Sequence, residues 1–484
     1  MKILFATSEV FPLIKTGGLG DVSYSLPNAL VELGHDLRLI LPAYGNMLKK
    51  LNKDNCKEIG QLMIPGAGHI HKARVLLFTE NETGVPLVLL DIPGLYGHRE
   101  NPYVDNKKQD WPDNAESFTV FSRGVAMIAN DEIDCGWRAE VVHSNDWQTG
   151  LVSGFIKQAG LDIKTVFTIH NLSYGGNFSH EIFTGLDLPQ AWWTLDGIEF
   201  YGNFSMLKAG IVFADHITTV SPSYAEEICT AEAGYGLEGV LSHLKHKLTG
   251  ILNGIDPDIW NPRTDPYLAT NYDARYRRLK GKMDNKTALL HGFGLTHDNE
   301  PLIGFIGRLV EQKGVDLVVS IIPDIMESTN SKLIMLGSGQ PEYERELLDM
   351  AKHYPDRMIV TIGYSEAMAH RIEAASDIFL MPSRFEPCGL NQMYSQRYGT
   401  LPVVHRTGGL ADTVVDASET NINNKTATGF VFDKTDRNDF LQTLRHAIDL
   451  YENKKIWNQM TMTAMQKDSS WQSSAEKYLE LYQS

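Results

Sequence analysis

Residues 15–21 read KTGGLGD, and residues 406–412 read RTGGLAD. Each copy follows a short apolar run and precedes an amphipathic segment, so each predicts a strand, a glycine turn and a helix N-terminus. Such an N-terminus carries unpaired N–H groups and a partial positive charge, and paired glycines let a ligand approach closely. The repeat therefore predicts two similar domains that face one cleft, each with a turn suited to a phosphate or another electron-rich ligand.

Short apolar runs alternate with helical periodicity along the whole chain, which is typical of parallel βαβ units. In the first half we expect strands at Ile3–Ala6, Leu37–Leu41, Val85–Leu90, Glu140–His143, Thr165–Ile169 and His216–Val220. The pattern restarts in the second half, at Leu302–Ile306, Leu333–Leu336, Met358–Ile362, Ile378–Met381, Leu401–Val404 and Gly429–Phe432. The polar tract from Asn253 to Asn299 is interpreted as loop, with a hinge near residues 250–255. The predicted fold class is α/β, with two doubly wound domains.

Composition excludes several classes of protein. The chain has 484 residues, of which 43% are hydrophobic and 21% charged, as in ordinary soluble globular proteins. A formal net charge of -16 argues against nucleic acid or an anionic membrane as the main partner. The 4 cysteines are far apart and form no CxxC pair, so neither a disulfide framework nor a zinc knuckle is expected. No apolar run reaches the roughly 18 residues of a membrane span, and we expect a cytoplasmic protein.

Two cations follow the first expected strand of the second half, in the run GFIGRLVEQKG at residues 304–314. Arg308 and Lys313 can converge on one diphosphate, because arginine forks across two oxygens and lysine supplies a point charge. The alternative is two solvated surface cations, but ligands of doubly wound sheets bind at the carboxyl ends of strands. Lys15 stands in a comparable place before the first glycine turn. Neither turn matches a P-loop or the dinucleotide fingerprint.

Polar residues follow three other expected strands. Glu386, in SRFEPCGL at residues 383–390, can accept hydrogen bonds from sugar or ribose hydroxyls, or can simply cap a helix. Cys388 is predicted to be a small buried residue rather than a nucleophile. His170 can hydrogen-bond a substrate hydroxyl or can be a structural histidine, and His143 has the same placement one strand earlier. The spacing of these two histidines supports no metal site.

Taken in order, these segments resemble the bacterial glycogen synthase and plant starch synthase family. The phrases that carry the resemblance are Lys15–Val22, Trp111–Asn114, His170–Leu172, Leu252–Asp256, Gly307–Gly314, Pro382–Leu390 and Thr407–Asp412. They span nearly the whole chain in collinear order. The resemblance implies the GT-B fold, with Rossmann-like domains at residues 1–250 and 251–465 and a C-terminal helix, 466–484, that crosses back to the first domain.

The resemblance also implies a reaction. The family transfers glucose from ADP-glucose to the non-reducing 4-hydroxyl of an α-1,4-glucan, with retention of configuration and without a metal or other cofactor. The implied partners are ADP-glucose and glycogen or a malto-oligosaccharide, and no nucleic acid or membrane.

The resemblance implies roles for the residues at matching positions. The implied catalytic residues are Lys15, His170, Arg308, Lys313 and Glu386. The implied donor-binding residues are Lys15, Gly17, Gly18, Asp21, Asn253, Arg308, Lys313, Tyr364, Glu386, Cys388, Gly389, Leu390, Thr407, Gly408 and Gly409. The implied acceptor-binding residues are Tyr96, Asp146 and Trp147. Tyr364 is expected to stack on adenine, and the diphosphate charge is assigned to Arg308 and Lys313 rather than to Arg406.

The chain departs from the family pattern at three places in the first half. Asn145 stands where many members carry a second histidine, Gly175 replaces a frequent glutamine, and Gly97 replaces a common aspartate after tyrosine. All three concern the expected acceptor side. Other readings are a sugar-nucleotide epimerase, a glycosyltransferase for small acceptors, a non-enzymatic glycan-binding scaffold and, more weakly, a nicotinamide oxidoreductase.

Overall fold

The computed structural model describes residues 1–45, 47–274, 279–296 and 299–484, and it divides into two compact units. Unit 1 comprises Met1–Asn253 and Trp471–Ser484, and unit 2 comprises Gly254–Ser470. The division falls at residue 253 rather than 250. The returning segment starts at 471 rather than 466, because Gln466 still belongs to the preceding helix of unit 2.

Unit 1 is built on a nine-stranded sheet with the order β12-β11-β7-β6-β1-β2-β5-β4-β3. Its strands are β1 Lys2–Ala6, β2 Asp36–Pro42, β3 Cys56–Gly66, β4 His69–Phe78, β5 Leu87–Asp91, β6 Val141–Asn145, β7 Lys164–Ile169, β11 His216–Thr219 and β12 Leu248–Gly250. All neighbouring pairs are parallel except β3–β4 and β4–β5, which are antiparallel. A separate three-stranded antiparallel sheet contains β8 Asn177–Ser179, β9 Glu199–Phe200 and β10 Asn203–Ser205.

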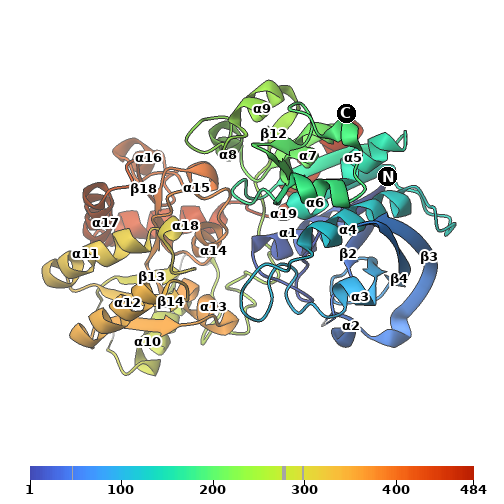
Figure 1. The fold of residues 1–484 in the computed structure, drawn as a ribbon. Helices are drawn as coiled ribbons and strands as arrows, with labels where there is room; N and C mark the ends of the chain where they lie inside the picture. The colour runs from blue at the N-terminus through green and yellow to red at the C-terminus, as the bar shows by residue number, and fades with distance from the viewer. Residues whose placement is uncertain (46, 275–278, 297–298) are drawn as a thin grey trace. The chain divides into compact units, whose positions relative to one another are not determined.

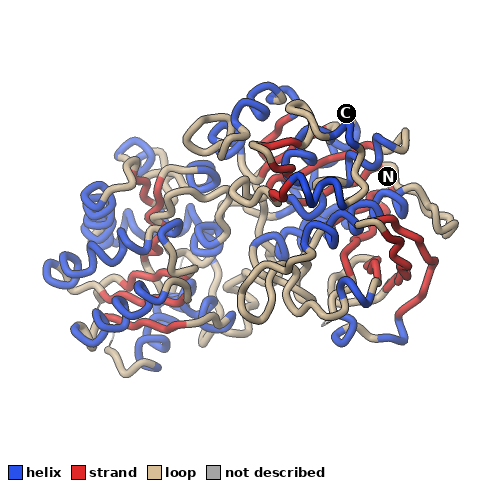
Figure 2. The backbone as a smooth tube through the Cα atoms, viewed as in Figure 1, coloured by secondary structure: helices blue, strands red, loops and turns tan. Residues whose placement is uncertain are grey.

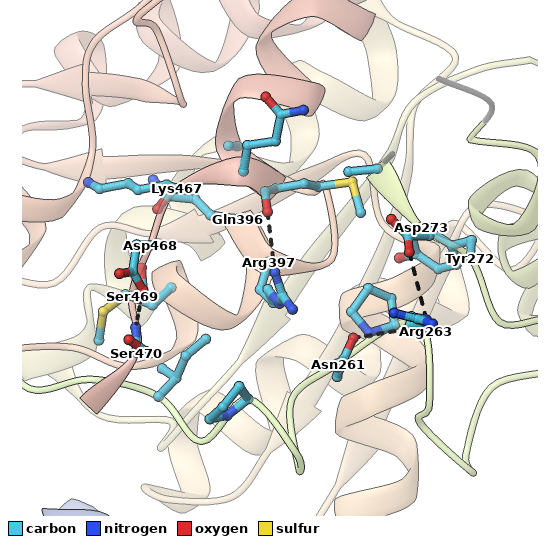
Figure 3. A pocket seen from close by; sticks show the side chains of 18 residues that line it. Asn261, Arg263, Tyr272, Asp273, Gln396, Arg397, Lys467, Asp468, Ser469 and Ser470 are labelled. Atoms are coloured by element: carbon cyan, nitrogen blue, oxygen red, sulfur yellow. Dashed lines mark hydrogen bonds and ion pairs between the residues drawn. The ribbon is translucent and has the colours of Figure 1, made fainter. Parts of the chain in front are cut away.

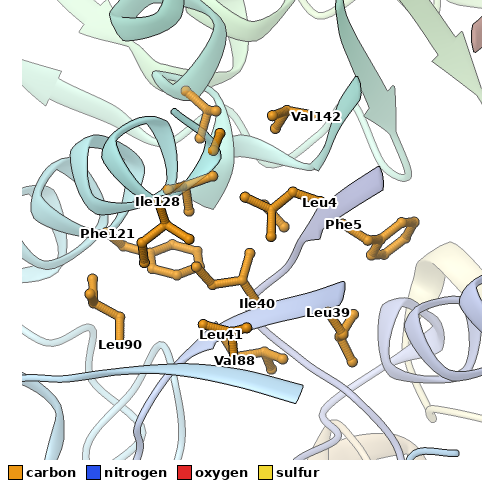
Figure 4. Close-up of a cluster of buried hydrophobic side chains, with 14 of the residues drawn as sticks. Leu4, Phe5, Leu39, Ile40, Leu41, Val88, Leu90, Phe121, Ile128 and Val142 are labelled. Carbon is orange, nitrogen blue, oxygen red and sulfur yellow. The ribbon is translucent and has the colours of Figure 1, made fainter. Parts of the chain in front are cut away.

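Helices pack around this sheet (Figures 1 and 2). They are α1 Gly18–Glu32, α2 Met47–Lys50, α3 Pro93–Tyr96, α4 Asn114–Ala129, α5 Val152–Gln158, α6 His180–Gly185, α7 Met206–Phe213, α8 Pro222–Glu227, α9 Glu238–His243 and α19 Trp471–Gln483. Figure 4 shows one part of the core, where Leu4 of β1, Ile40 of β2 and Phe121 of α4 belong to one buried cluster. α19 packs against α1, and its Tyr478 and Tyr482 are buried.

Unit 2 contains a six-stranded, fully parallel sheet with the order β15-β14-β13-β16-β17-β18. Its strands are β13 Leu302–Ile306, β14 Lys332–Gly337, β15 Met358–Ile362, β16 Ile378–Met381, β17 Leu401–His405 and β18 Phe430–Phe432. Its helices are α10 Lys280–Gly292, α11 Val315–Ser328, α12 Pro341–His353, α13 Glu366–Ala375, α14 Asn391–Arg397, α15 Gly408–Thr413, α16 Glu419–Asn423, α17 Arg437–Tyr451 and α18 Lys454–Gln466. All six strands of this half were expected, within two residues at each end.

Three parts of unit 1 and one of unit 2 differ from the sequence-based expectation. The β3–β4 hairpin was missed because much of it alternates exposed and buried residues instead of forming apolar runs. The small β8–β10 sheet and the edge strand β12 were missed because their strands are only two or three residues long. In unit 2 the tract read as loop contains α10, whose apolar residues do not form a marked stripe. Residues 275–278 and 297–298 of that tract lie outside the described residues. No helix within the described ranges is both long and apolar enough to cross a bilayer.

Candidate active site

The topological switch point of unit 1 lies between β1 and β6, the two central strands from which the parallel order runs outward in opposite directions. Doubly wound sheets bind ligands at such a point, outside the carboxyl ends of the strands. The KTGGLGD loop follows β1, Asp146 and Trp147 follow β6, and His170 follows β7. The structure thus brings the sequence-predicted residues of the first half to one edge of one sheet.

A buried glutamate that was not predicted holds the first glycine turn. Glu9 is 3% exposed, and its carboxylate accepts hydrogen bonds from the N–H of Thr16, from the hydroxyl of Thr16 at 2.6 Å and from the N–H of Gly17 at 3.2 Å. The hydroxyl of Tyr103 donates to the same carboxylate. Gly17 is the N-cap of α1, with Gly18 as its first residue, so Glu9 fixes the geometry at the start of that helix. Its position three residues after β1 was the only signal in the sequence.

Lys15 lies across this turn from the first turn of α1. Its Nζ is 2.7 Å from Oδ1 of Asp21, and the two side chains are 34% and 28% exposed. Two predicted donor-binding residues therefore contact each other, and the ammonium group stays partly accessible to solvent. A partly exposed pair of this kind is weak, so Lys15 can exchange its carboxylate partner for another anion.

His170 is held by Asn145, the residue that departs from the family pattern. Nε2 of His170 is 2.9 Å from Oδ1 of Asn145, while Nδ2 of Asn145 donates to the carbonyl oxygen of Ala6 at 3.0 Å. Because the Ala6 carbonyl can only accept, it fixes the amide orientation, and the His170 proton must sit on Nε2. Burial lowers the pKa of His170 to about 3, so the ring is neutral and Nδ1 keeps its lone pair.

Asp146 and Trp147 occupy different surroundings. The carboxylate of Asp146 accepts the N–H of His170 at 2.7 Å, and burial raises its pKa to about 7. Trp147 is half-buried, with its ring 5.0 Å from that of Phe118. Asp146 therefore positions the start of the His170 segment, whereas the indole of Trp147 has an accessible part.

Tyr96 and His143 are core residues. Tyr96 is fully buried and its hydroxyl donates to the carbonyl oxygen of Ser117 at 2.9 Å, which contradicts its assignment to acceptor binding. His143 is also fully buried, between the hydroxyls of Tyr482 and Thr168, each at 2.6 Å. Burial lowers the pKa of His143 to about 3. This histidine therefore joins α19 to the sheet and has no access to a ligand.

The switch point of unit 2 lies between β13 and β16. Three of the predicted donor-binding residues follow these two strands. Arg308 and Lys313 follow β13, and Glu386 follows β16. Nζ of Lys313 is 2.5 Å from Oε2 of Glu386, an oxygen that also accepts the Ser383 hydroxyl at 3.0 Å. Arg308 is exposed and donates to Oε1 of Gln312 at 2.9 Å. One cation is thus held in place and the other lies open to solvent.

The second glycine turn packs directly on the loop that carries Glu386. A Cβ atom on Gly408, whose φ is 43°, would lie 2.1 Å from the carbonyl oxygen of Glu386. A Cβ on Gly409 would lie 2.1 Å from the carbonyl oxygen of Cys388. The N–H of Gly409 donates to the Glu386 carbonyl at 3.1 Å. The two glycines of RTGGLAD are therefore required by close backbone packing, a reason that the sequence reading had not identified.

The remaining residues of this loop are buried or hydrogen-bonded to neighbouring residues. Cys388 is 5% exposed, as expected of a small buried residue, and Thr407 is also buried. Gln392, which was not predicted, donates to the carbonyl oxygens of Cys388 and Gly389, each at 3.0 Å. Leu390 is the N-cap of α14. These contacts fix the backbone on which Glu386 sits.

Three other residues named in the sequence analysis are Tyr364, Arg406 and Asn253. Tyr364, after β15, is 69% exposed, and its hydroxyl donates to Glu366. Arg406 pairs with Asp433 at the surface, at 2.5 Å. Asn253 ends the long segment of unit 1 and is 7% exposed, and its Oδ1 has no hydrogen-bond partner among the described residues.

Comparisons with known proteins match the chain over its whole length. Residues 2–243 match the family model described as the starch synthase catalytic domain, and residues 291–462 match glycosyl transferases group 1. A glycogen synthase of Hydrogenovibrio crunogenus is 47% identical and one of Cellvibrio japonicus 48% identical, with 99% and 98% of those proteins covered. The chain belongs to the glycogen and starch synthase family of glycosyltransferases.

A solved structure of the family has the same GT-B fold. The catalytic domain of starch synthase IV from Arabidopsis thaliana, bound to ADP and acarbose, is 33% identical with a TM-score of 0.87, over 100% of this chain and 98% of that one. A sucrose-phosphate synthase from Thermosynechococcus elongatus, 16% identical with a TM-score of 0.60 over 100% of this chain and 98% of that one, shares the fold alone. Both findings confirm the predicted fold class.

A large cavity of this family member lies elsewhere in unit 2. It has a volume of about 470 Å³, and Figure 3 shows Arg397 and Lys467 lining it together with Arg263, which pairs with Asp273 at 3.9 Å. None of the predicted catalytic, donor-binding or acceptor-binding residues lines it. This cavity is therefore separate from the candidate active site.

Proposed function

We propose that this chain is a glycogen synthase that transfers glucose from ADP-glucose to the non-reducing 4-hydroxyl of an α-1,4-glucan, with retention and without a metal. The observation that carries the proposal is the group Arg308, Lys313 and Glu386 at the switch point of unit 2. The chain that contains this group is 47% identical to one protein named glycogen synthase and 48% identical to another. The ADP bound to the starch synthase relative supports a nucleotide-sugar donor.

The chemistry needs positive charge more than it needs a nucleophile. The bond between glucose C1 and the diphosphate oxygen breaks, and a bond between C1 and the acceptor O4 forms. The proton of the 4-hydroxyl passes to the departing phosphate oxygen. The leaving group gains negative charge as the bond breaks, and fixed cations aimed at that charge lower the barrier. We assign this task to Arg308 and Lys313, and we favour attack on the same face that the phosphate leaves.

The other residues are assigned by their surroundings. Glu386 and the backbone of residues 388–390 would hold the sugar or ribose, and residues 407–409 would hold the glucose or phosphate region. Tyr364 offers an exposed ring to adenine. His170, neutral with Nδ1 unprotonated, would accept a hydrogen bond from a glucosyl hydroxyl.

Three further residue assignments lie outside that group. Lys15, with Asp21 as its present partner, is proposed to contact the donor, and Trp147 the acceptor. Asn253 remains a proposed donor contact through its unpartnered Oδ1. We also propose a cytoplasmic location, with no nucleic acid or membrane as partner.

The decisive experiment measures ADP release and incorporation of labelled glucose from ADP-glucose into glycogen. Arg308→Ala and Lys313→Ala should each lower kcat about 100-fold or more. Arg406→Ala is the matched control, since it removes an exposed arginine paired with Asp433 after a neighbouring strand, and it should retain activity within about threefold. Near-normal turnover of both test variants would remove the leaving-group role.

The same assay separates the alternatives. Incorporation from UDP-glucose but not ADP-glucose would overturn the donor assignment. Turnover without any glucan primer would favour an epimerase or a transferase for small acceptors. Glycogen binding without ADP release would favour the non-enzymatic scaffold.

A further inference from the structure

Three potential metal ligands meet in unit 1, at the tip of the hairpin that the sequence reading missed. β3 ends at Gly66 and β4 begins at His69, with Ala67 and Gly68 between them at positive φ values of 48° and 76°. His69 and His71 are two residues apart on one strand, so both side chains point to the same face. Glu116 lies in the first turn of α4, which packs against β3.

The distances between the three groups fit a small divalent cation. Oε1 of Glu116 is 3.0 Å from Nε2 of His71 and 3.4 Å from Nε2 of His69. All three ligand atoms lie within 4.8 Å of one another. Tetrahedral zinc with bonds of about 2.0–2.1 Å separates its ligand atoms by roughly 3.3 Å. Within the described part of the chain this is the one group of three or more His, Cys, Asp or Glu side chains with such spacing.

The proton positions leave lone pairs where a cation would bind. Nδ1 of His69 lies 3.1 Å from the carbonyl oxygen of Ala67. A carbonyl only accepts, so this nitrogen carries the proton and Nε2 is bare. Metal-binding histidines in proteins are commonly oriented in this way by a second hydrogen bond.

His71 brings a second imidazole nitrogen to the same carboxylate. Its side chain is 9% exposed, and its Nε2 lies 3.0 Å from Oε1 of Glu116. Two imidazole nitrogens are thus directed at one carboxylate oxygen, an arrangement in which a cation can take the place of a shared proton.

We propose that His69 Nε2, His71 Nε2 and Glu116 Oε1 bind one zinc-class divalent cation, with water as a further ligand on the exposed side. Two imidazoles and a carboxylate form a donor set suited to Zn²⁺. The side chain of His69 is 56% exposed, so the site has an entry path. The N–H of Gly68 donates to Oδ2 of Asp187 at 2.9 Å, which holds the turn in place before any metal binds.

The cation would act as a structural clip and takes no part in glycosyl transfer. It would connect the hairpin tip at the edge of the sheet to the first turn of α4. That helix carries Phe118, whose ring packs against Trp147. The inference depends on none of the residues assigned to glycosyl transfer, so the two proposals can fail separately.

The test uses the full-length protein, stripped with EDTA and desalted. Equilibrium dialysis against Zn²⁺ should give one tightly bound ion per chain, and Co²⁺ should give the visible spectrum of a four- or five-coordinate site. His69→Ala and Glu116→Gln should each weaken zinc binding about 100-fold or more, and Zn²⁺ should raise the thermal midpoint of the unchanged protein but not of these two variants. His246→Ala, which removes an exposed histidine elsewhere in unit 1, is the control and should bind normally.

Two results would overturn the proposal. One is the absence of a stoichiometric zinc ion in the unchanged protein, which would mean that a proton alone joins the histidines to Glu116. The other is equal binding by His69→Ala and the control, which would place any zinc elsewhere. Since His69 is largely exposed, its replacement should fold even if replacement of the buried His71 does not. Neither result depends on glycosyl transfer.

Discussion

The contact between Asn145 and His170 gives a sharp test of how the active site is built. Asn145 is fully buried, and its amide joins the carbonyl oxygen of Ala6 at the end of β1 to Nε2 of His170 after β7. Asn145→Ala removes both hydrogen bonds without adding bulk. The Nε2–H of His170 then loses its acceptor, and the ring loses the contact that fixes its proton and orientation.

The size of the effect follows from these two contacts. Leaving a buried donor unsatisfied costs about 1–3 kcal/mol. If that cost falls on the catalytic orientation of His170, kcat should drop about 5- to 150-fold, because each 1.36 kcal/mol is about tenfold in rate. Asn145→His should retain more activity than Asn145→Ala, since a neutral imidazole can also accept the Nε2–H. The KM for ADP-glucose should change less than kcat, because the cations after β13 are untouched.

The assay is steady-state kinetics with ADP-glucose and glycogen, together with a thermal unfolding midpoint for each variant. His170→Ala provides the reference for complete loss of the imidazole. If Asn145→Ala turns over within twofold of the unchanged protein at a similar midpoint, then Asn145 does not position His170. A loss of activity that only parallels a loss of folded protein would likewise refute the argument.

Three further predictions concern stability, each measured by urea unfolding. Gly408→Ala should lower the free energy of unfolding by more than about 1 kcal/mol, because residue 408 has a positive φ and the new Cβ would clash with the carbonyl oxygen of Glu386. Gly17→Ala is the control and should be tolerated, because a Cβ at residue 17 has no atom within 4 Å. Lys286→Met should cost about 3–5 kcal/mol, because it leaves the buried Asp377 carboxylate, now 2.7 Å from Nζ, without its cation. His143 has a pKa of about 3 when folded and about 6.5 when unfolded, so below pH 6.5 only the unfolded state is protonated and stability falls toward pH 3. His143→Gln should remove up to about 1.4 kcal/mol per pH unit of that slope, visible between pH 7 and pH 5.

The parallel core of each unit was predictable because its strands are buried on both faces. Residues of β13 and β16 are almost all apolar, and such runs stand out without any knowledge of neighbours. The β3–β4 hairpin lies at the sheet edge, where only every second residue needs to be apolar, and β3 contains the exposed Met63 and the buried Leu62 side by side. A search for apolar runs misses that pattern.

The candidate site, too, could be predicted only where its residues follow core strands. Arg308, Lys313 and Glu386 could be placed together because each follows a core strand whose order can be inferred. Glu9 could not be recognised, because its role depends on the folding back of residues 15–17 onto its carboxylate. The pair His69 and His71 was overlooked for a related reason, since its third ligand, Glu116, is far away in the sequence and is brought close only by the packing of α4.

The ion pair between Lys313 and Glu386 leads to a prediction about how the proposed donor site would bind its substrate. The pair is mostly buried, with the side chains 23% and 9% exposed, so a lone charge of either sign would be costly there. A donor diphosphate offers Lys313 more negative charge than one carboxylate does, and the ammonium would turn toward it. The Glu386 carboxylate would keep the Ser383 hydroxyl as a donor, and its freed oxygen would accept a sugar hydroxyl. Glu386→Gln should therefore weaken sugar recognition and also loosen Lys313, so its effect and that of Lys313→Ala should combine less than additively in the double variant. Strict additivity in ADP-glucose kinetics would show that the two residues act independently.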